Sequence, residues 1–189
     1  VGSEMCIRDR MSSEHRKECL HNLKAIGYQT GCGIMAGSPY QTTAHIAQDL
    51  EFIHGLQPEM VGIGPFIPHH DTPFKDRPAG TLRQTLLLLA IVRLMLPDVL
   101  LPATTALGSI EPDGREQGVM AGANVVMPNL SPLEVRKKYM LYDNKISTGV
   151  EAAANIKELK NRMASIGYEV VTDRGDHKKI KEVPALKTS

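Results

Sequence analysis

The sequence predicts an α/β protein in which parallel strands alternate with helices. Between residues 60 and 129, apolar strands run three times straight into polar or Gly/Pro-rich turns. Such continuous apolar runs are typical of parallel strands that are buried on both faces. Amphipathic helical segments lie between them. Four successive strand–helix units fit half of a β/α barrel or half of a doubly wound sheet, and the pattern alone does not separate the two.

The elements can be placed in order from their capping and turn residues. Ser12 or Ser13 can cap a first helix, which carries an apolar stripe from Cys19 to Ile26 and stops at Gly27. The later elements are a strand over 28–35, a helix opened by Thr42 or Thr43, a strand over 60–64, a helix from Thr81 to Leu96, a strand over 99–105, a helix from Asp113 to Ala121, a strand over 124–127 and helices over 133–142 and 151–166.

The chain divides into four segments. Residues 1–10 read as a non-native linker of the kind left by sequencing, because they carry neither a signal-peptide pattern nor a helical pattern that continues. Residues 11–145 hold the β/α units and residues 146–176 a helical extension. Residues 177–189 form a Lys-rich tail that we expect to be loose.

Charge and cysteine content exclude several partner classes. Lys plus Arg number 22 against 21 Asp plus Glu, so no basic field attracts nucleic acid or an anionic membrane. The apolar run 86–96 is interrupted by Arg93 and is too short to span a bilayer. Three cysteines without a C-x-x-C pair favour a reducing cytoplasm. We expect Cys19 and Cys32 to be small buried hydrophobes.

Candidate pocket residues follow the strands, because substrate groups collect at the carboxyl ends of barrel strands. These candidates are Thr104, Thr105, Met127 and Asn129. The adjacent hydroxyls of Thr104 and Thr105 are suited to hydrogen bonding with a small polar ligand. Threonines at such positions are, however, more commonly ordinary β-branched strand residues. Methionines such as Met60 and Met127 more often fill gaps in a core.

Two charged groups are harder to interpret. His69-His70-Asp71 contains the ligand types of a facial metal triad, but adjacent residues rarely turn both imidazoles to one ion, and we expect no metal there. Arg115-Glu116 either faces the mouth of a barrel or is a solvated pair, and the sequence does not decide.

Several segments together resemble the radical S-adenosylmethionine (SAM) maturases of iron-only hydrogenase, the HydE family. The resemblance runs from about residue 11 to 176 and corresponds to the C-terminal half of such an enzyme. Biotin synthase and methylornithine synthase are similar at a greater distance. The motifs that carry it are Glu14-His15-Arg16 and residues 27–33, 62–69, 102–106, 114–116 and 127–129.

The resemblance implies about half of a TIM-type β/α barrel with a C-terminal helical extension. It also implies reductive cleavage of SAM at a 4Fe-4S cluster, followed by attack of the 5′-deoxyadenosyl radical on an iron carbonyl cyanide cysteine precursor. Other hydrogenase maturation proteins are possible partners. The matching SAM-binding positions are Arg16, Ile67, Tyr139 and Leu141, and the matching substrate-pocket positions are Thr104, Thr105, Met60 and Met127.

The sequence lacks the family's C-x-x-x-C-x-x-C cluster loop, so we expect this chain alone to be inactive. Ser147, Asn155 and Glu158 stand where some members carry cysteines for an accessory cluster, which we therefore expect to be absent. Two alternatives remain: a biotin-synthase-like or methylornithine-synthase-like enzyme, and a non-catalytic half-barrel that serves in binding or assembly.

Overall fold

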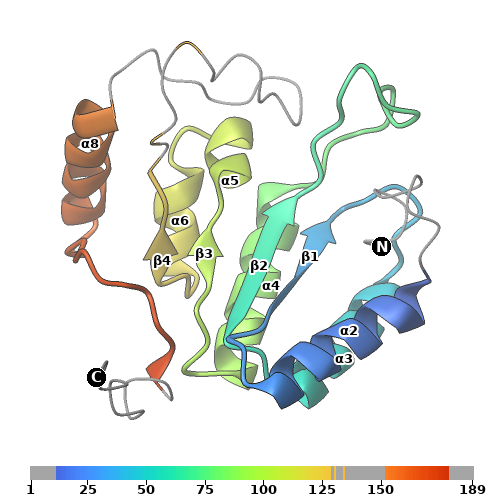
Figure 1. Cartoon of the computed structure of the whole chain (residues 1–189). Helices are drawn as coiled ribbons and strands as arrows, with labels where there is room; N and C mark the ends of the chain where they lie inside the picture. Colours follow the sequence, from blue (N-terminus) through green and yellow to red (C-terminus); the bar gives the residue numbers. More distant parts are fainter. Residues whose placement is uncertain (1–11, 129, 131–133, 135–151, 179–189) are drawn as a thin grey trace, which may run out of the picture.

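The computed structural model describes residues 12–128, 130, 134 and 152–178. Its centre is a parallel sheet whose strands lie side by side in chain order, β1-β2-β3-β4 (Figure 1). The strands are β1 (Gly31–Ala36), β2 (Met60–Pro65), β3 (Pro102–Ala103) and β4 (Val125–Val126). The register pairs Gly31 with Met60, Ile63 with Ala103 and Ala103 with Val126.

The helices connect these strands and flank the sheet. Their N-caps are local: the Ser12, Thr42 and Thr81 side chains each accept the backbone N–H three residues later. This confirms the predicted starts of the first three helices. The helices are α2 (Ser13–Ile26), α3 (Thr43–Leu56), α4 (Leu82–Met95), α5 (Thr105–Ile110), α6 (Gly114–Met120) and α8 (Ala152–Ser165).

The core lies between one face of the sheet and the helices. Alternate strand residues such as Val61 and Ile63 are 0% exposed and join Leu89 of α4 and Met163 of α8 in one cluster of buried side chains. A doubly wound sheet would place helices on both faces and reverse its strand order. Among the described residues neither occurs, so the prediction of an α/β fold is confirmed in its partial-barrel form.

The third strand differs from its prediction. A strand over 99–105 was expected, but β3 contains only Pro102 and Ala103, and Thr105 already begins α5. The expectation for Thr105 was wrong because two β-branched residues favour a strand locally. Here Thr104 instead takes the extended conformation of an N-cap, with φ −66° and ψ 153°.

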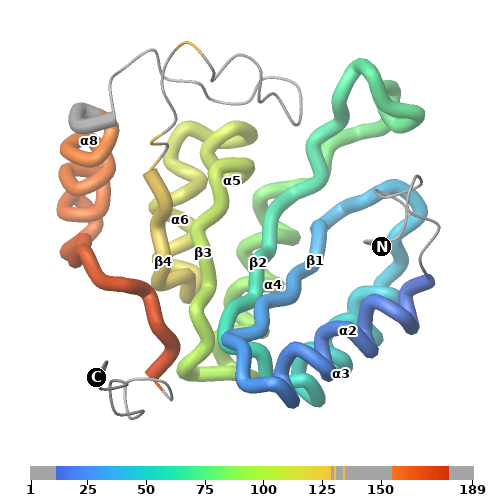
Figure 2. The backbone as a smooth tube through the Cα atoms, viewed as in Figure 1, coloured from blue at the N-terminus to red at the C-terminus, as the bar shows by residue number. Residues whose placement is uncertain are grey.

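The C-terminal end of the described chain contacts the segments that precede β1 and β3, at the amino ends of the strands. After α8 the chain returns towards these ends (Figure 2). There the His177 backbone N–H donates to Gln29 Oε1 at 2.9 Å, and Lys178 Nζ lies 2.6 Å from Asp98 Oδ1. His177 is only 5% exposed. The first two residues of the expected loose tail are therefore held, while residues 179–189 and the linker 1–10 lie outside the described part.

The first helix is less buried than its apolar stripe suggests. No residue of α2 is buried, and Ile26 is 72% exposed. Cys19 of this helix and Cys32 of β1 are half-buried instead of fully buried. The predicted helix over 133–142 lies outside the described residues apart from position 134.

Candidate functional site

The face of the sheet turned away from the core is lined by glycines. In β1 and β2 the residues that alternate with the core positions are all exposed or half-buried, and they are Gly31, Gly33, Met35, Met60, Gly62 and Gly64. We call this side the inner face. Glycines in a strand interior allow the close approach of a ligand or of neighbouring backbone.

Close contacts surround two of these glycines, and at Gly33 they exclude any side chain. A Cβ on Gly33 would meet Gly62 O at 2.3 Å, which no side chain tolerates, whereas a Cβ on Gly62 would have 3.9 Å to its nearest neighbour. A Cβ on Gly64 would meet Thr104 Oγ1 at 3.1 Å. The inner face therefore exposes backbone at its four glycines and is bordered by the Thr104 side chain.

Thr104 carries an unused polar atom at this border. Its Oγ1 is buried and has no hydrogen-bond partner within the described part of the chain. A buried hydroxyl without a partner costs about 1–3 kcal/mol relative to a satisfied one. Such an atom at the carboxyl end of a barrel strand is suited to hydrogen bonding with a ligand. Thr105 is half-buried in the first turn of α5, and its carbonyl accepts from Ser109 Oγ at 3.2 Å.

The two candidate methionines lie at opposite ends of the inner face. Met127 follows Val126, the pairing partner of Ala103, so it stands level with Thr104 on the neighbouring strand. It is 53% exposed. Met60 alternates with Gly62 and Gly64 but begins β2, at the amino end. The structure therefore brings Thr104 and Met127 together and leaves Met60 at the base of the same face.

The described SAM-binding candidates lie towards the carboxyl ends of the strands. Arg16 is half-buried in the first turn of α2, whose N-terminus lies near the loop after β1, at the carboxyl end of that strand (Figure 1). Ile67 is half-buried and follows β2 at the same edge. Tyr139 and Leu141 lie outside the described residues, as does Asn129.

Arg115 and Glu116, left open by the sequence, have separate roles. Arg115 Nη2 donates to Met127 O at 2.7 Å and so fixes the backbone after β4. Glu116 is 8% exposed and pairs with Arg162 of α8. Hydrogen bonding to the Glu116 carboxylate is the largest cause that holds the pKa of Arg162 above its ordinary value. The pairing of Glu116 was not detectable from sequence, because its partner lies 46 residues away.

The loop after β2 is held by aromatic contacts that sequence reasoning did not anticipate. Phe74 packs edge-on against Phe66 and against Tyr40 of the preceding β/α loop, with ring centroids 6.3 and 6.4 Å apart. The Arg77 guanidinium lies 4.9 Å from the centre of the Tyr40 ring and donates to its hydroxyl. These contacts fix the loop that contains His69 above the carboxyl edge of the sheet.

A cavity of about 450 Å³ lies away from this edge. It is lined by Leu100 and Ala123, which precede β3 and β4, and by Tyr168 and Asp176 of the chain after α8. Since barrel chemistry takes place at the carboxyl ends of strands, this cavity at the amino end is not the candidate site.

Sequence comparison identifies relatives of the chain, although no family model matches it. It is 42% identical over 176 residues to the [FeFe] hydrogenase maturase subunit HydE of Thermotoga maritima. The aligned residues make up 93% of this chain and 51% of the relative. The chain resembles the C-terminal half of HydE. It is also 30% identical over 149 residues to a 3-methylornithine synthase of Methanosarcina acetivorans, covering 77% of this chain and 40% of that protein.

A solved structure supports the fold. The crystal structure of methylornithine synthase (PylB) matches with a TM-score of 0.65 at 24% identity, over 87% of this chain and 47% of the other. HydE and PylB are biotin-synthase-like radical SAM enzymes, and the chain spans about half the length of the relatives it matches. None of the helices in the described ranges is long and apolar enough to cross a membrane.

Proposed function

We propose that the chain is the C-terminal half of a cytoplasmic radical SAM enzyme of the HydE type. The observation that carries the proposal is the 42% identity to HydE across 93% of this chain. The lower identity of 30% to the 3-methylornithine synthase favours HydE as the closer functional guide.

The chain's own residues would bind and orient the two reactants. Arg16 offers a planar set of donors that suits the carboxylate of SAM. Ile67, with Tyr139 and Leu141, would provide an apolar wall for the nucleoside. The unpartnered Thr104 hydroxyl, Thr105 and the methionines would hold an organometallic substrate against the glycine-lined inner face, where bare backbone leaves space.

This chain does not contain ligands for the radical-generating cluster. Its three cysteines, Cys6, Cys19 and Cys32, are each separated by 13 positions and form no C-x-x-x-C-x-x-C set. The 4Fe-4S cluster, which supplies the electron for SAM cleavage in such enzymes, would have to be held by residues outside this sequence. The chain alone is therefore proposed to be inactive.

The genomic DNA upstream of Ser12 tests the proposal directly. A continuous reading frame that encodes C-x-x-x-C-x-x-C and further β/α units supports it. A genuine start codon near Met11 overturns the enzyme assignment for this chain and favours the non-catalytic half-barrel.

Where the longer frame exists, the Thr104→Val variant of the whole enzyme tests the pocket. Loss of one ligand hydrogen bond, about 0.5–1.5 kcal/mol, should raise the KM for substrate about 2- to 10-fold. SAM cleavage without substrate should be unchanged, and Thr43→Val on exposed α3 is the matched control. Formation of 3-methylornithine by the wild-type enzyme, in place of hydrogenase maturation, would establish the alternative substrate class.

A further inference from the structure

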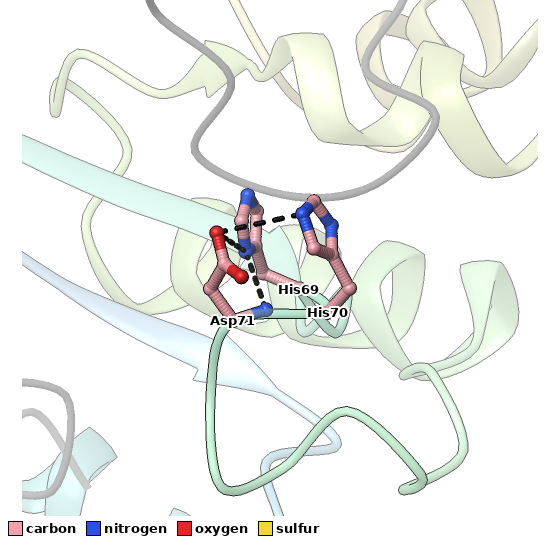
Figure 3. A group of neighbouring side chains, drawn as sticks. All are labelled: His69, His70 and Asp71. Atoms are coloured by element: carbon pink, nitrogen blue, oxygen red, sulfur yellow. Dashed lines mark hydrogen bonds and ion pairs between the residues drawn. The ribbon is translucent and has the colours of Figure 1, made fainter.

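The loop after β2 brings three metal-ligand side chains together, although their adjacency in sequence argued against it. One ligand atom each from His69, His70 and Asp71 lies within 4.8 Å of the other two (Figure 3). Asp71 Oδ2 is 4.0 Å from His69 Nδ1 and 3.4 Å from His70 Nε2. The turn at this point places both imidazoles on one side of the loop, stacked with centroids 4.3 Å apart.

These separations are close to those of a bound ion. Zinc ligands at about 2.0–2.2 Å in a tetrahedral site are roughly 3.3–3.6 Å apart. The Asp71–His70 distance already fits, and the longest separation must shorten by little more than about 1 Å. Rotation about the broad χ2 torsions of histidine and aspartate can supply this without moving the backbone.

The backbone beneath the three side chains is already ordered. The Thr72 backbone N–H and Oγ1 both donate to His69 O, at 3.0 and 2.8 Å. The Asp71 N–H donates to His69 Nδ1 at 3.1 Å. Nδ1 is the acceptor in this hydrogen bond, and an acceptor nitrogen is the form that metal coordination requires. An ion bound at Nδ1 would replace the hydrogen bond from the Asp71 N–H.

We propose that His69, His70 and Asp71 bind one Zn²⁺ ion. Two imidazoles and a carboxylate form a donor set that zinc accepts, and three protein ligands leave a fourth position for water. The side chains of His70 and Asp71 are 67% and 78% exposed, so the ion can enter from solvent. The site is at the mouth of the half-barrel and would fix the loop above the inner face.

Calorimetric titration of the 189-residue chain with Zn²⁺ tests the site, in a background in which the three cysteines are replaced by serine to remove thiol binding. We expect one saturable site in the wild type and affinity at least about 10-fold weaker in His70→Asn and in Asp71→Asn. His54→Asn, an exposed histidine near the end of α3, is the matched control and should bind as the wild type does.

A second measurement does not depend on variants. Zinc should shift the ring signals of His69 and His70 in NMR spectra of the wild type and leave those of His54 in place. The proposal is overturned if the wild type has no saturable site, if the Asn variants bind unchanged, or if other histidine signals shift instead. None of these outcomes affects the proposed SAM chemistry, because the ion uses different residues.

Discussion

The Arg162 guanidinium of α8 donates two hydrogen bonds to the Glu116 carboxylate of α6. Arg162 Nη2 lies 2.7 Å from Glu116 Oε2, and Arg162 Nε donates to Oε1. The Arg162 guanidinium also donates to Pro112 O. Because Glu116 is 8% exposed, the pair ties the C-terminal helix to the barrel in a partly dry environment.

Breaking this pair should loosen α8. We expect Glu116→Gln and Arg162→Met each to lower the free energy of unfolding by about 1–3 kcal/mol, since hydrogen bonds to charged groups are stronger than neutral ones. A double-mutant cycle by urea denaturation measures the coupling. Arg174→Met is the control, because the Arg174–Asp176 pair has an arginine that is 81% exposed and should contribute little. A coupling near zero would contradict the prediction.

The glycine-lined inner face predicts a contrast between two neighbouring positions. Gly33→Ala should destabilise the protein by about 1–3 kcal/mol through overpacking, because its Cβ would overlap Gly62 O. Gly62→Ala, whose Cβ would be in ordinary van der Waals contact with Cys32 O at 3.9 Å, should have a much smaller effect. Thermal unfolding of both variants checks this, and equal losses would mean that the close approach of β1 and β2 is absent.

Burial should protect one thiol from alkylation. Burial raises the pKa of Cys32 to about 11, against a weaker opposing effect of Lys24. At pH 8 its thiolate fraction should be roughly 300-fold lower than that of an ordinary thiol with a pKa of about 8.5. Iodoacetamide labelling of a Cys6→Ser, Cys19→Ser variant, followed by mass spectrometry, measures the rate. Labelling as fast as that of a free peptide thiol would show that Cys32 is accessible.

Glu59 should make stability depend on pH in the acid range. Burial opposes its ionisation, but hydrogen bonds from Lys24 Nζ and the Thr30 N–H together hold its pKa below the ordinary value. A lowered folded pKa contributes stability that is complete above the unfolded pKa of about 4.3 and is lost as pH falls through the folded value.

The Glu59→Gln variant isolates this contribution. The difference in unfolding free energy between wild type and variant should be constant near neutral pH and shrink below about pH 4.3. Urea denaturation at a series of pH values measures it. A difference that persists at low pH would assign the effect of the substitution to packing.

The helices were predictable because their signals are local. Ser12, Thr42 and Thr81 each lie three residues from the N–H that they cap, so sequence spacing alone places the helix starts. The start of α5 at Thr105 was not predictable. Thr104 has the extended backbone of an N-cap, but its side chain makes no cap hydrogen bond. No local signal therefore competed with the strand propensity of the two threonines.

The candidate site was predictable only as far as strand ends could be located. Thr104 and Met127 were named because both follow strands, and the register does place them at one level. Met60 came from resemblance and lies at the other end of β2. A metal site at His69-His70-Asp71 was not expected, because adjacent residues rarely turn both imidazoles to one ion, and sequence spacing does not show how a turn orients neighbouring rings.

The contact between Gln29 and His177 has a consequence for the order of folding during synthesis. The two residues are separated by 148 positions. When residue 128 has left the ribosome, every strand of the described sheet has been synthesised. Gln29, which leads into the first strand, cannot yet form its hydrogen bond, because residue 177 has not been synthesised. Closing this contact must therefore be a late event, and a nascent chain stopped before residue 177 should show faster hydrogen exchange at the entrance to β1 than the released protein.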